Sequence, residues 1–375
     1  MTSLEHCGAI LTIDLDAIAA NYRLLRGKLA GAACAAVVKA DAYGLGIDNV
    51  APALAAAGCE TFFVALIDEG IALRRNLRQA DIHVINGPPP GSETTFARHR
   101  LTPVLNSLAD IEAWSLFSKA RERPLAADIH IDTGMSRLGL PPEELEILAA
   151  EPQRLDNIEV DNVMSHLACA DEPDHPLNRR QLDAFRKARR AVAAARRASL
   201  ANSSGLFLGA DYHFDLARPG AALYGVGPLP GKPNPMAQVV RLQGKILQIR
   251  DVDTPQTVGY GATHSVARRQ RIATVAAGYA DGFLRSLSNR GKGYMGDIRV
   301  PIVGRVSMDL VAFDVSNVPV EAAKPGAVVD LIGPHNPIDR IAAEAGTIGY
   351  EILTSLGRRY HRVYLGESTR ALACK

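Results

Sequence analysis

The stretch Ala35-Ala36-Val37-Val38-Lys39-Ala40-Asp41-Ala42-Tyr43-Gly44 places a lysine at the end of an apolar run that is typical of a buried strand. Burial disfavours the charged ammonium and lowers its pKa, so a lysine in this position needs a chemical task. A neutral amine can form a Schiff base with a carbonyl cofactor such as pyridoxal phosphate. Tyr43, four residues further on, could hold a phosphate or the lysine itself. The alternative is a lysine that only snorkels out of a strand end.

The sequence around this stretch alternates apolar runs with amphipathic segments. Eight runs are candidate strands, namely residues 33–40, 61–66, 81–85, 101–106, 125–132, 158–166, 198–202 and 214–223. Helical patterns lie between most of them, and Ser107 is a plausible N-cap for the pattern that follows it. Strands that alternate with helices predict a parallel sheet, and eight such units in about 200 residues predict a (β/α)8 barrel of the TIM type.

The pattern changes at residues 225–235, which are rich in glycine and proline. Short strand-like runs with little helix follow, except for one helical pattern at residues 338–359, and predict a mainly-β domain. We therefore expect an N-terminal barrel over residues 1–235 and a C-terminal β domain over residues 236–375. Residues 1–12 could pair with the β domain, because a strand-like run begins at residue 10.

Composition restricts the classes of function. The chain has 375 residues, of which 47% are hydrophobic and 22% charged, and a formal net charge of +2. This balance gives no reason to expect nucleic-acid or membrane binding, and the arginine-rich residues 178–197 are better read as a solvated outer helix. The five cysteines are scattered without metal-binding spacing, and no apolar stretch is long enough to span a bilayer. We expect a cytoplasmic protein without a metal site.

Polar residues follow several of the predicted barrel strands. Lys39 ends the first strand, Arg137 follows the fifth, His166 ends the sixth, residues 202–205 follow the seventh, and residues 218–220 lie on the eighth. Each has an ordinary explanation as a surface or turn residue, but strand ends in such a barrel meet at one mouth. Their convergence predicts one site, and the Ser- and Gly-rich exits of the last two strands suit a phosphate.

These motifs resemble those of the alanine racemase family, which are fold-type III pyridoxal-phosphate enzymes. The matching segments cover nearly the whole chain: residues 37–44, 132–139, 165–166, 201–203, 218–220, 258–262, 278–282 and 304–309. The first motif alone also occurs in related barrels, whereas the whole set in this order is specific.

The resemblance implies a barrel followed by a β domain, in a head-to-tail homodimer whose sites each combine one barrel mouth with the partner's β domain. It implies that L-alanine and D-alanine are interconverted by two bases, for peptidoglycan synthesis or for alanine catabolism. Lys39 would carry pyridoxal 5'-phosphate and serve the D-enantiomer, and Tyr260 of the second chain would serve the L-enantiomer. His166 would hydrogen-bond to Tyr260 and to Arg218.

The resemblance also assigns contacts to the cofactor and the substrate. Phosphate contacts would come from Tyr43, Ser203, Gly220, Ala221 and Tyr350. Arg218 would face the pyridine nitrogen and leave it unprotonated, because a guanidinium does not readily give up a proton. Arg137 would contact the phenolic oxygen of the cofactor and the substrate carboxylate. Met308 of the second chain would offer its backbone N–H to that carboxylate.

One position departs from a common family pattern. Many members have a carbamylated lysine seven residues before the arginine that matches Arg137, and this chain has His130 there. Histidine cannot form the same stable carbamate. Our hypothesis is that a hydrogen bond from neutral His130, or a bound anion, orients Arg137 instead.

Other functions on the same scaffold remain open at this point. A broad-specificity amino-acid racemase has the same motifs, since pocket width depends on loops that the sequence does not define. Decarboxylases of this type typically use a cysteine from the partner's β domain, and the only cysteine of the β domain here is Cys374. Vitamin B6 carriers on the same barrel have no β domain.

Overall fold

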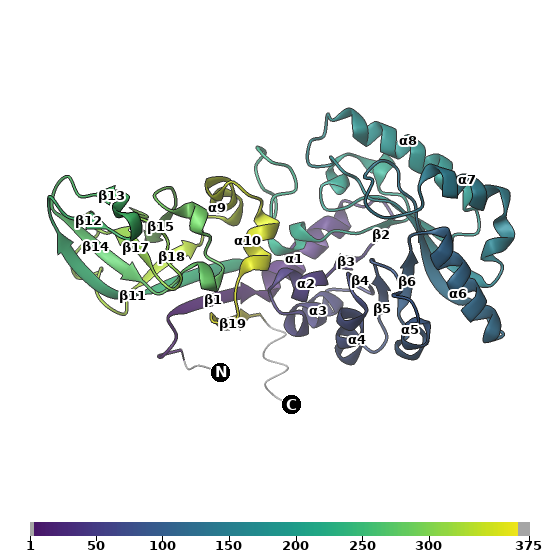
Figure 1. Ribbon diagram of the computed structural model, residues 1–375, viewed down its shortest axis with the longest axis horizontal. Coiled ribbons are helices and arrows are strands. Elements are labelled where there is room, and N and C mark those ends of the chain that lie inside the picture. Colours follow the sequence, from purple (N-terminus) through teal and green to yellow (C-terminus); the bar gives the residue numbers. More distant parts are fainter. Residues whose placement is uncertain (1–3, 367–375) are drawn as a thin grey trace.

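A barrel and a β-sheet domain lie at opposite ends of an elongated molecule in the computed structural model, which describes residues 4–366 (Figure 1). The barrel strands are β2 (Ala33–Cys34), β3 (Ala36–Val37), β4 (Thr61–Val64), β5 (Asp81–Val84), β6 (Thr102–Leu105), β7 (Leu125–His130), β8 (Ile158–Met164), β9 (Arg197–Ser199) and β10 (Leu216–Ala217). Strands β3 to β9 pair in order and in parallel, and β10 pairs with β2. Hydrogen bonds from Ala35 N to Ala217 O and from Arg218 N to Ala201 O, both 2.9 Å, close the ring. The predicted barrel is confirmed.

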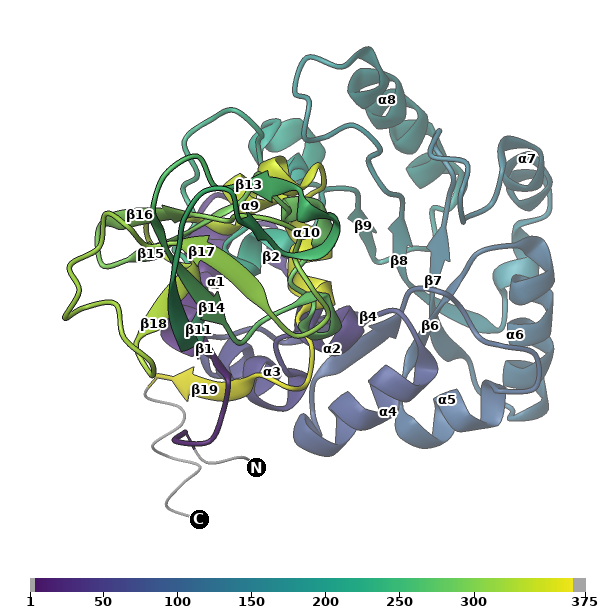
Figure 2. The same ribbon diagram turned by 60° about the vertical axis from the view of Figure 1, so that its left-hand side comes forward.

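Helices surround these strands (Figure 2). They are α1 (Leu15–Gly27), α3 (Ile47–Ala56), α4 (Ile67–Asn76), α5 (Glu93–His99), α6 (Leu108–Ala120), α7 (Pro142–Ala150) and α8 (Pro176–Ala191). The predicted N-cap of α6 is confirmed, because the Ser107 side chain accepts a hydrogen bond of 3.1 Å from Asp110 N. Short 3-10 turns are η1 (Pro152–Leu155), η2 (Gly205–Phe207), η3 (Ala210–Tyr212) and η4 (Ala221–Tyr224).

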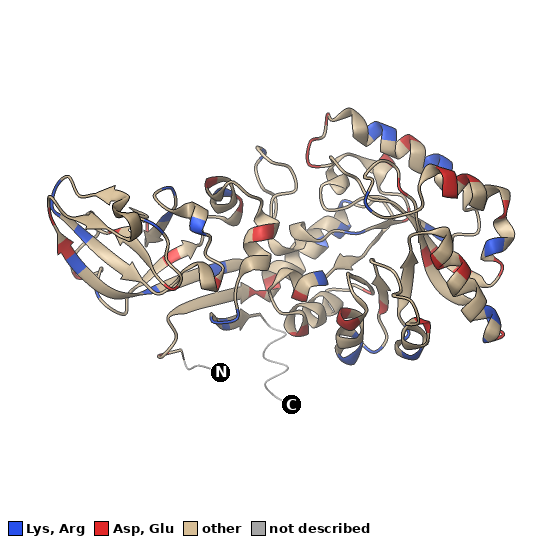
Figure 3. Cartoon of the chain, viewed as in Figure 1, with Lys and Arg blue, Asp and Glu red and all other residues tan. Residues whose placement is uncertain are grey.

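Helix α8 contains most of the arginine-rich segment and lies on the outside of the barrel, and it carries one acidic residue, Asp183, among its basic residues (Figure 3). Its arginines form ion pairs with acidic neighbours, among them Arg179 with Asp183 and Arg189 with Asp215. The interpretation as a solvated outer helix therefore agrees with the contacts.

The second domain is built on a sheet to which both ends of the described chain contribute. Its strands are β1 (Ala9–Asp14), β11 (Val240–Val252), β14 (Gln270–Val275), β15 (Lys292–Met295), β16 (Ile298–Pro301), β17 (Val311–Asp314), β18 (Val328–Ile332) and β19 (His361–Leu365). Strand β1 pairs antiparallel with β11 and parallel with β19. The hairpin β12 (Thr257–Val258) and β13 (His264–Ser265) carries η5 (Tyr260–Ala262), and η6 (Tyr279–Asp281) and η7 (Arg285–Leu287) lie in later loops.

Three predicted elements differ in detail from the structure. The run at residues 33–40 is two short strands, and the chain leaves strand geometry at Val38, where ψ is 19°. The run at residues 214–223 is strand only at Leu216–Ala217, and η4 follows after Pro219 and Gly220. The single helix predicted at residues 338–359 is two helices, α9 (Ile338–Ala345) and α10 (Gly349–Ser355), because Gly346 ends α9 with a φ of 74°.

Cysteine and membrane predictions can be compared with the described residues only. Cys7, Cys34, Cys59 and Cys169 are free thiols, and Cys374 lies outside the described residues. Between residues 4 and 366 there is no helix with the length and apolar character needed to cross a membrane.

Candidate active site

A cavity of about 890 Å³ opens at the carboxyl ends of the barrel strands. Its lining includes every predicted site residue except Tyr260 and Met308: Lys39, Tyr43, Arg137, His166, Ser203, Arg218, Gly220, Ala221 and Tyr350. Tyr350 reaches the mouth from α10, which lies between the two domains and packs against the short segment α2 (Lys39–Tyr43) (Figure 1). Both domains of one chain therefore build this cavity.

Lys39 stands at the start of a left-handed turn. The residues from Ala40 to Tyr43 have φ values of 53°, 55°, 54° and 56°, although none of them is glycine. Such a conformation costs roughly 1–2 kcal/mol per residue, so surrounding contacts must hold it. Burial lowers the pKa of the Lys39 amine, and the positive charge of Arg137 lowers it further, while Glu69 opposes both. The site therefore favours a neutral amine more than bulk water does.

Ser203, Gly220 and Tyr43 form a cradle in the wall of the same cavity. The Ser203 hydroxyl accepts hydrogen bonds from Gly220 N at 2.9 Å and Ala222 N at 3.2 Å. A Cβ on Gly220 would lie 2.3 Å from the Tyr43 hydroxyl, so only glycine allows this approach. The ring centroid of Tyr350 lies 6.2 Å from that of Tyr43. Hydroxyls and backbone amides grouped in this way suit a phosphate.

Arg218 is buried beneath the cavity with its guanidinium held on two sides. It donates hydrogen bonds to the Ser199 hydroxyl and to Ser165 O. Burial lowers its pKa to about 10, and the Asp128 carboxylate acts in the opposite direction. The side chain therefore remains a cation at neutral pH and cannot act as an acid there.

The sequence did not predict a buried polar cluster that lies inside the barrel. His83 Nδ1 lies 2.7 Å from Asp128 Oδ2, and Asn162 Nδ2 donates to the other oxygen of Asp128 at 2.7 Å. Burial alone would lower the pKa of His83, but the Asp128 carboxylate outweighs it and raises that pKa. The sequence signal was a polar residue inside each of three apolar strands, β5, β7 and β8, which alternation along a strand directs toward the barrel interior.

Two histidines near Arg218 are held neutral. Burial lowers the pKa of His130 to about 4, with help from the Arg218 charge, and the same causes take the pKa of His166 well below its usual value. His130 Nδ1 lies 2.8 Å from Asn106 Oδ1, so its N–H donates to that amide. Among the described residues, His130 makes no hydrogen bond to Arg137. Direct orientation of Arg137 by His130 therefore finds no support in these contacts.

The loop that carries Arg137 is ordered by Asp132. One oxygen of this carboxylate accepts backbone hydrogen bonds from Gly134, Met135 and Ser136, at 2.9, 2.9 and 3.1 Å. Arg137 is exposed, and it lines both the main cavity and a neighbouring hollow of about 580 Å³. It thus stands where the cavity opens to its surroundings.

Tyr260 and Met308 lie on the β domain, outside the cavity of their own chain. Their side chains are 72% and 53% exposed. Gly259 packs beside Arg305 N, which brings the two motifs that carry these residues together. Ala280 N also donates to Met308 O at 2.9 Å. The two motifs therefore form one exposed patch of the β domain.

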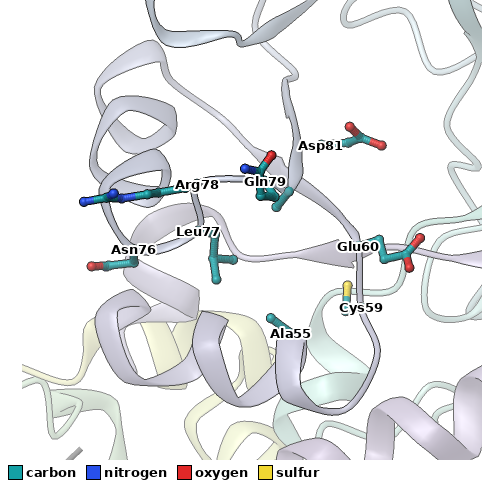
Figure 4. A pocket seen from close by; sticks show the side chains of 9 residues that line it. Ala55, Cys59, Glu60, Asn76, Leu77, Arg78, Gln79 and Asp81 are labelled. Carbon is teal, nitrogen blue, oxygen red and sulfur yellow. The ribbon is translucent and has the colours of Figure 1, made fainter. Parts of the chain in front are cut away.

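A further hollow of about 660 Å³ lies where β4 and β5 begin, at the other end of the barrel from Lys39 (Figure 4). Leu77, Gln79 and Asp81 are among its lining residues, with Cys59 at its edge. Burial raises the pKa of the Cys59 thiol to about 12, so it is a poor nucleophile. This hollow therefore offers no activated thiol.

A lysine-centred site in a (β/α)8 barrel, with an appended β domain, defines a class of two-domain barrel enzymes. Residues 13–228 match the family model "Alanine racemase, N-terminal domain", and residues 239–364 match "Alanine racemase, C-terminal domain". The chain belongs to the alanine racemase family.

Individual relatives agree over nearly the full length. An alanine racemase of Rhodospirillum rubrum is 55% identical over 368 residues, with 96% of this chain and 97% of the relative covered. A catabolic alanine racemase of Agrobacterium fabrum is 53% identical, with 95% and 92% covered. The crystal structure of alanine racemase from Bartonella henselae, with covalently bound pyridoxal phosphate, superposes with a TM-score of 0.91 at 43% identity and covers 96% of this chain and 100% of that one.

Proposed function

We propose that this chain is an alanine racemase that interconverts L-alanine and D-alanine with pyridoxal 5'-phosphate held at Lys39. The observation that carries the proposal is the cavity itself, in which a desolvated lysine, a phosphate-type cradle and a buried arginine converge. The family membership and the named activity of the relatives support the same reaction.

The residues of the cavity fit this cofactor. Lys39 can present a neutral amine, and the close approach of Gly220 to Tyr43 leaves a cradle that any Cβ would fill. Ser203, Ala221 and Tyr350 would complete the phosphate contacts, and Arg218 would face the ring nitrogen. When bound, the cofactor supplies an electron-withdrawing ring that makes the Cα–H of an amino acid acidic.

Racemisation requires a proton to leave one face of Cα and another to arrive on the opposite face. Lys39 Nζ would act on the face of the D-enantiomer, and the Tyr260 hydroxyl on the face of the L-enantiomer. A guanidinium only donates hydrogen bonds, so Arg218 would donate to one ring nitrogen of neutral His166. The other ring nitrogen then carries the single N–H, which would donate to the Tyr260 oxygen. That chain of donors would stabilise the phenolate form of Tyr260.

Substrate orientation would come from both domains. Arg137 stands at the opening of the cavity, where its guanidinium can pair with the carboxylate of alanine. Met308 would add a backbone N–H from a second copy of the chain. Tyr260 and Met308 are exposed on their own chain, so the proposed site needs a homodimer that brings them to the partner's barrel mouth.

The reaction serves either D-alanine supply for the cell wall or alanine catabolism, because both use the same chemistry. The relatives from Agrobacterium fabrum and Mesorhizobium japonicum, at 53% and 51% identity, are named catabolic. We accordingly propose that this chain serves alanine catabolism as well as D-alanine supply, and that it acts in the cytoplasm.

The proposal is tested on the purified protein. We expect a yellow protein in which borohydride fixes the cofactor on Lys39, as read by peptide mass spectrometry. A panel of L-amino acids should show alanine as the preferred substrate. A colourless protein that binds no pyridoxal phosphate would end the proposal, and equal turnover of large side chains would replace it with a broad-specificity racemase.

A further inference from the structure

Glu69, in the first turn of α4, binds the backbone at the ends of two barrel strands with one carboxylate. Its Oε1 accepts a hydrogen bond of 2.6 Å from Ala40 N. Its Oε2 accepts from Ala65 N at 2.7 Å and from Leu66 N at 3.1 Å. Ala40 directly follows Lys39, and Ala65 directly follows β4. Glu69 therefore joins the peptide next to Lys39 to the neighbouring strand.

The bond to Ala40 is not part of helix capping. A cap of α4 needs only the contact with Leu66 N, three residues before Glu69. Ala40 lies 29 residues away in sequence, and its N–H begins the segment of four successive positive φ values. A second contact holds the residue after Ala40 in that segment, since Asp41 Oδ1 accepts a hydrogen bond of 2.8 Å from Ile47 N.

The carboxylate is also one of the charges that act on the lysine. Burial and the charge of Arg137 lower the pKa of Lys39, and Glu69 is the group that opposes them. Glu69 is half-buried, so its charge is only partly screened by solvent. One side chain thus combines a backbone contact beside Lys39 with an electrostatic effect on its amine.

We propose that Glu69 is a positioning residue for Lys39. Its carboxylate fixes the peptide after Lys39 to the end of β4 and thereby sets the direction in which the amine enters the cavity. The effect on racemisation rests on the proposed function. The three hydrogen bonds from Ala40 N, Ala65 N and Leu66 N to Glu69, here called the backbone clamp, do not rest on it. The direction of the amine matters because it must take a proton from one face of a carbon atom. A displacement of a catalytic group by about 1 Å can lower the rate on the order of a hundredfold.

The test uses the full chain and a matched control. Glu69→Gln keeps the size of the side chain, but it removes the charge and turns one acceptor oxygen into an N–H donor that faces a backbone N–H. Glu144→Gln is the control, since Glu144 is also half-buried and accepts a backbone hydrogen bond, from Leu108 N at 2.8 Å, beyond β6. Glu69→Asp keeps the charge and shortens the reach, which provides a milder variant if Glu69→Gln folds poorly.

Two measurements read the clamp. Amide exchange should become about tenfold faster or more at Ala40 in Glu69→Gln and remain unchanged there in Glu144→Gln. In the racemase assay, kcat should fall about tenfold in Glu69→Gln with KM changed less than about twofold, and Glu69→Asp should fall between it and the wild type.

A third measurement reads the charge without the reaction. Acylation of Lys39 in the cofactor-free full chain, followed by mass spectrometry across pH, should shift to lower pH in Glu69→Gln and stay in place in Glu144→Gln. Unchanged exchange at Ala40, or faster exchange with unchanged kcat and acylation, would overturn the proposal. If the wild type does not racemise alanine but exchange and acylation still change as expected, the clamp stands and the proposed function fails.

Discussion

Tyr260 is exposed in a single chain, although its proposed role requires it to lie in a buried site. It is 72% exposed on the hairpin of the β domain, yet it should carry a proton to a buried carbon atom. We expect Tyr260→Phe to lower kcat by about 10²–10⁴-fold, the usual contribution of a general acid or base, in both directions, because each direction uses both bases. Cofactor content should remain unchanged, because no predicted phosphate contact is lost.

The matched control for this variant is Tyr294→Phe, a half-buried tyrosine of the same domain whose ring packs on His335. Rates in both directions and the absorbance of the bound cofactor distinguish the two variants. Full activity of Tyr260→Phe in both directions would remove this residue from the mechanism.

His130 gives the protein a pH-dependent stability. Its pKa is lowered to about 4, chiefly by burial and then by Arg218, whereas an unfolded chain titrates near 6.5. Between these values the unfolded state binds more protons, so the free energy of unfolding falls as pH falls through this window. From pH 7 to pH 5 the expected loss from this one group is about 2 kcal/mol.

His130→Gln should remove that part of the loss and retain a donor for Asn106 Oδ1. Urea unfolding at pH 7, 6 and 5 measures it, with His6→Gln, at an exposed position, as the control. The pKa of His166 is also lowered, so this histidine adds a loss of stability at low pH in every variant. The difference between His130→Gln and the wild type therefore reports on His130 alone. Equal slopes for His130→Gln and the wild type would show that this histidine is not held neutral.

At the scale of elements, the segment from Lys39 to Tyr43 is the most strained. Ala40 is exposed with a φ of 53° and a ψ of 50°, so its side chain makes little packing contribution and its backbone decides the outcome. A β-branched residue is rare in this conformation. We expect Ala40→Val to lower the free energy of unfolding by about 2 kcal/mol.

Ala113→Val supplies the comparison, since Ala113 is exposed within α6 and should cost only about 0.5 kcal/mol through helix propensity. Urea unfolding measures both variants. Equal costs would mean that the segment is not left-handed in solution.

Helix α10 owes its position to a close contact at its C-terminal end. A Cβ on Gly282, where φ is +88°, would lie 1.8 Å from Ser355 O, whereas Gly346, where φ is +74°, has nothing within 4 Å. We expect Gly282→Ala to cost about 3 kcal/mol or more and to weaken cofactor binding, because Tyr350 lies on α10. Gly346→Ala should cost about 1 kcal/mol and leave binding intact. Urea unfolding and cofactor titration test both, and equal effects would contradict this account.

The sequence predicted those elements whose structure depends mainly on residues that are close together in the chain. Apolar runs separated by amphipathic segments predicted the barrel, and Ser107 predicted the start of α6. The left-handed turn after Lys39 was not predicted, because alanine disfavours this conformation, one aspartate does not specify it, and a long-range hydrogen bond to Glu69 helps to hold it. The break between α9 and α10 was visible as Gly346, but a continuous apolar pattern concealed it.

For the whole molecule, the prediction of the site depended on which residues share a mouth. Strand ends gave Lys39, Arg137, His166 and Arg218, because parallel barrel strands bring their carboxyl ends together. The cluster around His83 was not found, since its members lie inside strands and pair only after the barrel has closed. Tyr260 rests on the family resemblance alone, as no feature of one chain directs it to a cavity.

The proposed homodimer can be tested by mixing two inactive variants, because a shared site combines residues of two chains. If each site joins Lys39 of one chain to Tyr260 of the other, then Lys39→Ala and Tyr260→Phe are defects of different chains at the same site. After exchange of subunits, a mixed dimer has one site with both defects and one with neither. With equal amounts and random pairing, about a quarter of all sites should regain full activity, although each parent is nearly inactive. The racemase assay before and after mixing measures this recovery, and mass spectrometry of the intact dimers confirms the exchange. Since a site built within one chain would contain one defect in every mixed dimer, absence of recovery after demonstrated exchange would contradict the shared site.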